Sequence, residues 1–192
     1  MSIPTPRPLR ADAQQNHDRL LEVAAIAFSA DGADASLKAI AKDAGVGIGT
    51  LYRRFPTRDD LIEATYRNET ARLSERAPEL LLELAPREAM RVWMEGFVDY
   101  MLAKHGMADA LPSILAARDG LRLHSRDLLR GAIETLLQAC IDDDDLRSGV
   151  PANDVMMALG GITLIAVNES QRDLASRLID LLLAGLTAQP IN

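Results

Sequence analysis

Apolar residues recur at intervals of three and four along almost the whole of this 192-residue chain. That spacing places them on one face of an α-helix. The alternation of apolar and polar residues that is typical of half-buried β-strands is missing, and aromatic residues, which favour strands, make up only 4% of the chain. We therefore predict an all-α fold of about nine helices.

Capping and helix-breaking residues indicate where the helices begin and end. Ser36 is a favourable N-cap and Gly45 a favourable stop for one short helix, and Pro56 follows the end of the next. Thr57 is suited to cap the helix after that, and Pro86 to the first turn of a later one. The expected helices cover about residues 12–30, 37–44, 48–54, 58–76, 87–104, 111–118, 120–141, 152–168 and 171–187.

The single cysteine excludes a disulfide framework and a CxxC metal site. Cys140 falls on an apolar stripe, so we expect a buried, inert thiol, with a redox sensor as the alternative. His105 and Asp109 are four residues apart, but no third ligand is evident, and we predict neither a metal nor a cofactor. No catalytic or nucleotide-binding fingerprint occurs, so we do not expect an enzyme.

The net charge of −7 argues at first against nucleic acid as a partner. Residues 1–60, however, carry eight basic and eight acidic side chains, so the acidic excess lies entirely in residues 61–192. Residues 36–58 hold five basic side chains and one acidic one, a local charge of +4. A phosphate backbone would meet this local field and not the total.

Two short helices joined by a tight, glycine-containing turn make up this basic segment, which is the pattern of a helix-turn-helix motif. On the second helix Leu51 and Phe55 share an apolar face that would point to the core, while Thr50 and Arg54 share another. Hydroxyl groups and Arg or Lys side chains are groups that bind DNA phosphates. The alternative is an ordinary basic helix that faces solvent.

The run from Ser36 to Ile62, SLKAIAKDAGVGIGTLYRRFPTRDDLI, resembles the N-terminal domain of the tetracycline-repressor (TetR/AcrR) family of transcriptional regulators. The likeness is carried by Gly45-Val46, Gly49-Thr50-Leu51-Tyr52, Phe55 and Leu61. It implies a homodimer whose two recognition helices enter successive major grooves of a palindromic, double-stranded operator. It also implies a small-molecule pocket in each C-terminal domain, whose occupation moves the helix that begins near residue 58.

The resemblance also assigns roles within the motif. It implies phosphate contacts for Thr50, Tyr52, Arg54 and Arg58, a base or backbone contact for Lys38, and positions facing bases for Gly47, Ile48 and Arg53. The sequence departs from the family pattern at two of these positions. Gly47 replaces a Ser or Thr, which removes a side-chain cap, and Arg54 replaces a frequent His, which keeps a phosphate donor.

A stripe of Met and aromatic side chains on the helix expected at 87–104 suits an adaptable apolar pocket. The alternative is plain core packing. With the resemblance in view, the candidate ligand-binding residues are Trp93, Met94, Phe97, Tyr100, Met101, Met107, Leu111, His124, Leu128, Met156 and Thr163.

The last two expected helices are more apolar than one buried face requires, which indicates a subunit interface. Gly160 and Gly161 would let another helix approach closely. The alternative is the core of a monomer. The candidate interface residues are Leu159, Gly160, Gly161, Leu164, Leu178 and Leu182.

We thus expect a flexible basic arm over residues 1–12, a DNA-binding domain over 13–60 and a regulatory, dimerising domain over 61–192. The N-terminus lacks a signal peptide and no stretch suits a bilayer, so we expect a cytoplasmic protein. The predicted function is that of a homodimeric repressor released from DNA by a small, largely apolar ligand. The alternatives are an activator or effector-independent regulator, a helical enzyme using Asp99, His105 or His124, and a protein–protein adaptor.

Overall fold

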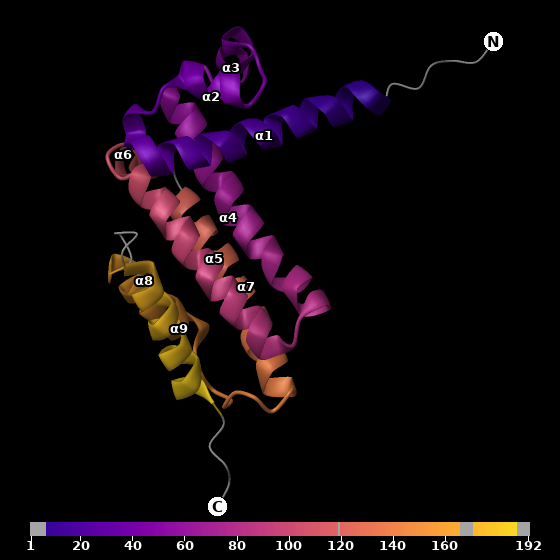
Figure 1. The fold of residues 1–192 in the computed structure, drawn as a ribbon, viewed down its shortest axis with the longest axis vertical. Coiled ribbons are helices and arrows are strands. Elements are labelled where there is room, and N and C mark those ends of the chain that lie inside the picture. The colour runs from indigo at the N-terminus through magenta and orange to yellow at the C-terminus, as the bar shows by residue number, and fades with distance from the viewer. Residues whose placement is uncertain (1–6, 119, 166–170, 188–192) are drawn as a thin grey trace, which may run out of the picture. The chain divides into compact units, whose positions relative to one another are not determined.

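The computed structural model describes residues 7–118, 120–165 and 171–187, with the backbone alone at 7–13 and 33. Over these residues every regular element is a helix, and the β-pairing consists of one isolated bridge between Leu146 and Thr187. The all-α prediction is confirmed (Figure 1). The elements are α1 (Arg7–Asp31), the short 3₁₀ helix η1 (Gly32–Asp34), α2 (Leu37–Asp43), α3 (Ile48–Arg54), α4 (Arg58–Glu83), α5 (Pro86–Gly106), α6 (Leu111–Ala117), α7 (Leu121–Asp142), α8 (Ala152–Ile165) and α9 (Arg172–Leu186).

The chain forms two compact units. The N-terminal unit contains the residues up to Asn68 together with Gly106–Ala117, and the C-terminal unit contains Glu69–His105 and the residues from Arg118 onward. The N-terminal unit therefore continues past residue 60, where we expected the boundary, and includes α6. Both α4 and α5 contribute residues to each unit.

Two helices differ in length from expectation. α1 begins at Arg7, so Arg7 and Arg10 belong to a helix, whereas we expected them in an arm over residues 1–12; residues 1–6 lie outside the described residues. Pro8 fits in the first turn, where no hydrogen bond from its nitrogen is needed. α4 runs through Pro78 to Glu83, and our prediction that it ends near residue 76 is wrong.

Burial of the residues around Pro78 explains why α4 continues. A proline inside a helix costs about 3 kcal/mol, because it removes a hydrogen bond and crowds the preceding turn. Ala77 is 0% exposed and Leu80 is 1% exposed. Full burial of one leucine contributes ~1.5–3 kcal/mol, so an end at residue 76 would forfeit packing of similar size.

The N-terminal unit is built on the apolar face of α1, where Leu20, Ala24 and Phe28 are at most 1% exposed. The end of α5 meets the end of α1 at Gly106. A β-carbon on Gly106 would lie 2.0 Å from the carbonyl oxygen of Phe28 and 2.8 Å from the Cα of Ser29. Only glycine lets the two backbones come this close.

Buried hydrogen bonds between helices, in addition to apolar packing, hold the C-terminal unit together. The Trp93 indole on α5 donates to the carbonyl of Leu73 on α4 over 2.7 Å. The hydroxyls of Thr70 and Tyr100, 3.2 Å apart, join the same two helices. Further along the chain, α8 packs against both α7 and α9 and lies side by side with α9 (Figure 1).

We predict that Gly106→Ala destabilises the protein, because the new β-carbon would overlap the carbonyl of Phe28, which is backbone and cannot rotate away. Overpacking of this kind costs typically ~1–3 kcal/mol, and the free energy of unfolding in a urea titration should fall by about that amount. Gly131→Ala is the control, since its β-carbon would have no heavy atom of the described chain within 4 Å and Ala favours a helix. Equal stability of the two variants would contradict the close contact.

Candidate nucleic-acid interface

Local signals in the sequence shape the turn between α2 and α3. The Ser36 hydroxyl accepts a hydrogen bond from the amide of Ala39 over 3.3 Å and so caps α2. At the other end Gly45 adopts a φ of +73°, and the amide of Val46 donates to the carbonyl of Ala41 over 2.9 Å. This is a Schellman ending, which favours glycine in the left-handed conformation. The predicted cap and stop are both confirmed.

α3 has an inward and an outward face. Leu51 is 0% exposed and Phe55 is 6% exposed, which confirms their predicted direction. The Phe55 ring stacks on the His17 ring of α1, with centroids 5.7 Å apart. On the outward face Ile48 and Tyr52 are 39% and 49% exposed. The core therefore anchors α3, and two large side chains stay accessible to a partner.

Exposed hydrogen-bond donors occur on both α2 and α3. Lys38, Arg53 and Arg54 are all exposed. The Arg53 guanidinium donates to the Thr50 hydroxyl oxygen over 3.0 Å. The Thr50 oxygen thus serves as an acceptor within α3, which leaves its O–H as a donor. The pairing also holds the Arg53 side chain along the helix surface.

Arg58, the first residue of α4, is half-buried and donates to the carbonyl of Ala35 over 2.7 Å. The residues beside it form a capping box. The amide of Asp60 donates to the Thr57 hydroxyl over 3.1 Å, and the amide of Thr57 donates to the Asp60 carboxylate over 3.0 Å. The predicted Thr57 cap is confirmed, and Arg58 fixes the start of α4 to the residue that precedes the α2 cap.

Gly47 is the N-cap of α3, with extended backbone and no side-chain cap. A β-carbon there would lie 4.0 Å from the Thr50 hydroxyl oxygen, which is ordinary van der Waals contact. Packing therefore does not demand glycine at this position. The missing cap costs only a few tenths of a kcal/mol relative to Ser or Thr.

The candidate ligand-binding residues are mostly buried. The rings of Trp93, Phe97 and Tyr100 follow one another along α5 with centroids 5.9 and 6.0 Å apart. Met107 and Leu111 belong to the N-terminal unit, whereas the other candidates belong to the C-terminal unit. The buried candidates are Trp93, Met94, Phe97, Tyr100, Met107, Leu111, Met156 and Thr163; Met101 and Leu128 are half-buried, and His124 is exposed.

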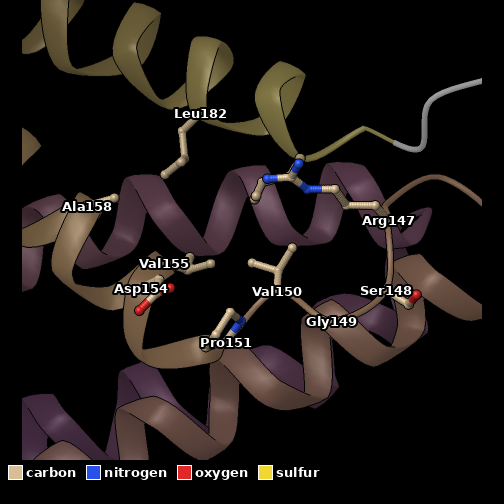
Figure 2. A pocket seen from close by; sticks show the side chains of 10 residues that line it. Arg147, Ser148, Gly149, Val150, Pro151, Asp154, Val155, Ala158 and Leu182 are labelled. Carbon is tan, nitrogen blue, oxygen red and sulfur yellow. The ribbon is translucent and has the colours of Figure 1, made fainter.

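A groove of about 520 Å³ lies between the α7–α8 connection, α8 and α9. Figure 2 shows Val150 and Val155 pointing toward one another and the Arg147 side chain extending toward α9. Leu182 is the one predicted site residue that lines it, and we had assigned Leu182 to the subunit interface. The sequence signal for this groove was the Gly149-Val150-Pro151 turn, from which we predicted no site.

A second groove of about 520 Å³ runs between α4 and α5 and is lined by one candidate ligand residue, Tyr100. Gly96 brings the two helices together here, since its β-carbon would lie 3.4 Å from the Leu73 side chain. Charged side chains make up much of the remaining lining, among them Glu75, Arg76 and Glu79. The groove is therefore more polar than a pocket for an apolar ligand.

The candidate interface residues divide between core and surface. Leu159 is fully buried in the single chain, and Gly160, Leu178 and Leu182 are half-buried. Gly161 is exposed and Leu164 is 78% exposed. Met157 and Leu181, which we did not predict, are 61% and 67% exposed. Because Met157, Gly161 and Leu164 recur at helical spacing, they form an exposed apolar stripe on α8.

Cys140 is fully buried, and its thiol lies 4.0 Å from the Met90 sulfur. Burial, with the nearby Asp145 carboxylate, raises the pKa of this thiol to about 11. The unreactive thiol form therefore dominates at neutral pH, which supports an inert residue over a redox sensor.

Within the described ranges no three His, Cys, Asp or Glu side chains are grouped to hold a metal ion. None of the described helices has the length and apolar content needed to cross a membrane.

Two family models match the chain. The model described as "Bacterial regulatory proteins, tetR family" matches residues 20–65, and "Transcriptional regulator SbtR-like, C-terminal domain" matches residues 85–188. An HTH-type transcriptional regulator of Staphylococcus aureus (strain USA300) is 43% identical over 54 residues, which are 28% of this chain and 29% of that protein. The match to this curated relative thus spans less than a third of its length.

Solved structures resemble nearly the whole chain. A TetR transcriptional regulator from Streptomyces coelicolor is 47% identical, with a TM-score of 0.85 over 90% of this chain and 98% of that chain. The TetR transcription regulatory protein from Mycobacterium vanbaalenii is 30% identical, with a TM-score of 0.76 over 94% of this chain and 100% of that chain. Both of these relatives are transcription regulators. The anchored helix-turn-helix and both family matches lead to one conclusion: the chain belongs to the TetR family of bacterial transcriptional regulators.

Proposed function

We propose that this regulator is a cytoplasmic homodimeric repressor, which binds a palindromic operator through α3 and leaves it when a small, largely apolar ligand binds. The observation that carries the DNA-binding part is the two-faced α3. Its buried side rests on the core, while Tyr52, Arg53 and Arg54 are exposed. A helix held in this way can enter a major groove as a rigid body.

Side chains around α3 supply both kinds of DNA contact. Tyr52, Arg54 and Lys38 would bind phosphates, with the Thr50 hydroxyl as a further donor. Ile48 would touch a thymine methyl group, and Arg53, on leaving Thr50, would reach a guanine. Gly47 offers no side chain to a base but allows close approach of the backbone. Arg58 would bind a further phosphate, and its bond to Ala35 holds the start of α4.

The exposed apolar stripe on α8 supports pairing of two copies. Met157, Gly161 and Leu164 on α8 are exposed, and so is Leu181 on the neighbouring α9. Exposed apolar residues that gather into a patch mark a protein–protein interaction site. Pairing would set two α3 helices about 34 Å apart, one turn of DNA, as a palindrome requires.

The buried rings on α5 support ligand control. A ligand weakens DNA binding only by the amount that it prefers the arrangement unable to bind DNA, typically ~1–3 kcal/mol. Trp93 is bonded to Leu73 of α4, and Tyr100 to Thr70 of α4. A ligand seated among these rings and the flexible Met94 and Met101 would disturb those bonds, and with them α4.

The test of the phosphate contacts is a pair of substitutions, Tyr52→Ala and Arg54→Ala, in a titration of DNA from the regulator's own upstream region. Loss of a charged hydrogen bond costs roughly 1.5–3 kcal/mol, and Arg54→Ala should weaken binding to all sequences by that amount. The slope of log affinity against log salt should also fall by about 1. Arg76→Ala, which removes an exposed arginine from the C-terminal unit, is the control. Unchanged affinity in both variants would refute the phosphate roles.

Ile48→Ala tests base reading separately. We expect a change in sequence preference that exceeds the change in overall affinity, because a methyl contact discriminates among bases without binding phosphate. Selection from a randomised operator library measures the preference directly. Leu123→Ala, which trims another exposed leucine-sized side chain, serves as the comparison. An Ile48→Ala profile identical to the wild type would remove Ile48 from the reading surface.

Gly161→Leu tests the interface. The fold should tolerate the change, because a β-carbon at Gly161 meets no heavy atom of the described chain within 4 Å. A leucine would nevertheless hold two α8 helices apart, so we expect the dimer to dissociate in analytical ultracentrifugation. Gly131→Leu is the control, since that helical glycine is equally open within the chain. A Gly161→Leu protein that stays dimeric would place the interface elsewhere.

A further inference from the structure

Four charged residues form a row on α5 that takes no part in the proposed DNA or ligand contacts. Arg87, Arg91, Glu95 and Asp99 are each four residues apart, so they line up along the helix. The row starts with two cations and ends with two acids. Such a pattern can distinguish one register of a neighbouring helix from others, because like charges would oppose each other in the wrong one.

The row meets α9 at three points. The contacts join Arg87 to the Thr187 hydroxyl over 3.3 Å, Arg91 to the Asp180 carboxylate over 2.8 Å, and Asp99 to Arg172. The numbers on α9 fall as those on α5 rise, so the two helices run antiparallel. Arg172 begins α9 and Thr187 is its C-cap, so α9 is tied at both ends and in between.

Arg91 is the centre of this set. It also pairs with Glu95 at 3.2 Å, and its side chain is 32% exposed, compared with 51% for Arg172. The hydrogen bond to Asp180, reinforced by the charges of Glu95 and Glu88, raises the pKa of Arg91. A cavity of about 380 Å³ lies beside the pair, lined by both Arg91 and Asp180. Long polar side chains therefore span the space between α5 and α9 here.

α9 carries different residues on its different sides. Ala175, Ile179 and Leu183 are buried and face the core. At helical spacing Arg172 continues that buried row at the start of α9, whereas Asp180 and Thr187 lie to one side of it. The apolar set Leu174, Leu178, Leu181 and Leu182 lies to the other side. Rotation of α9 about its axis would therefore turn the charged residues away from α5 and change which leucines face outward.

We propose that Arg91 and Asp180, with the contacts on either side of them, position α9 and so select the apolar surface that it offers to a second copy of this chain. The inference rests on the proposed function, because it assumes that two copies pair through α8 and α9. Arg91 and Asp180 are positioning residues in this scheme: they touch neither DNA nor the partner, and act through the orientation of α9.

The size of the expected effects distinguishes positioning of α9 from a contribution to the stability of the fold. Exposed ion pairs add little to the free energy of folding, and packing of α8 against α9 continues without them. Reversal of the charge at Asp180 has a larger effect, because two cations would then face each other between α5 and α9. The fold should survive such a change while the orientation of α9, and with it the dimer affinity, suffers.

The experiment compares Asp180→Arg, the neutral Asp180→Asn and the double variant Arg91→Glu with Asp180→Arg. For each we measure the dimer dissociation constant by ultracentrifugation and the melting temperature by circular dichroism. Glu83→Arg is the control, since it reverses an exposed pair with Arg76 that lies within α4. We expect Asp180→Arg to weaken the dimer roughly tenfold with little change in melting temperature. Asp180→Asn should weaken it less, and the double variant should recover most of the loss.

The outcomes are distinct. Dimer affinities for Asp180→Arg and Asp180→Asn that equal the wild type would overturn the inference, as would a double variant that binds no better than Asp180→Arg alone. A parallel fall in melting temperature and dimer affinity, without rescue, would make the pair merely structural and also overturn it. If Gly161→Leu leaves the dimer intact, the proposed interface itself fails. If Gly161→Leu breaks the dimer while the Asp180 variants do not, only the positioning role fails.

Discussion

The approach of Gly106 to the backbone of Phe28 is the constraint on which the N-terminal unit depends. It brings the end of α5, and with it α6, into the same compact unit as α1, α2 and α3. No side chain stands between the two backbones, so displacement of one presses directly on the other. The unit that carries α3 thus contains a segment from much later in the chain, and its shape depends on both.

The buried hydrogen bonds between α4 and α5 likewise restrict how these two helices can pack. Trp93 and Tyr100 could fill the core by size alone, but their polar atoms must find partners, and Leu73 and Thr70 of α4 supply them. A buried polar group without a partner costs ~1–3 kcal/mol, so only one pairing of α4 and α5 satisfies these groups. Two of the residues proposed to contact a ligand, Trp93 and Tyr100, are therefore the ones that fix the helix pair.

The helix-turn-helix could be predicted from the sequence because its signals act locally. Ser36, Gly45 and Thr57 each bond to groups within a few residues. The length of α4 could not be predicted, because burial of Leu80 outweighs the local penalty of Pro78. The hydrogen bond from Arg58 to Ala35 joins residues 23 positions apart, and no local sequence pattern predicts such a contact.

For the C-terminal part, patterns located the apolar helices but not the direction of each side chain. Leu159 and Gly161 are two residues apart on α8 and so point to opposite sides of the helix, but only the packed fold decides that Leu159 is buried and Gly161 exposed. The groove around Val150 needs the α7–α8 connection, α8 and α9 together. Features of this kind depend on how several helices pack, which a single helical period does not encode.

The burial of Cys140 makes the protein convenient for spectroscopic labelling. The chain has no other cysteine, and a thiol whose pKa is about 11 reacts slowly with maleimides at neutral pH. A cysteine introduced at an exposed position of α3 would therefore take up a spin label or dye selectively while the native residue stays in place. In the proposed homodimer, the distance between two such labels would measure the separation of the two α3 helices.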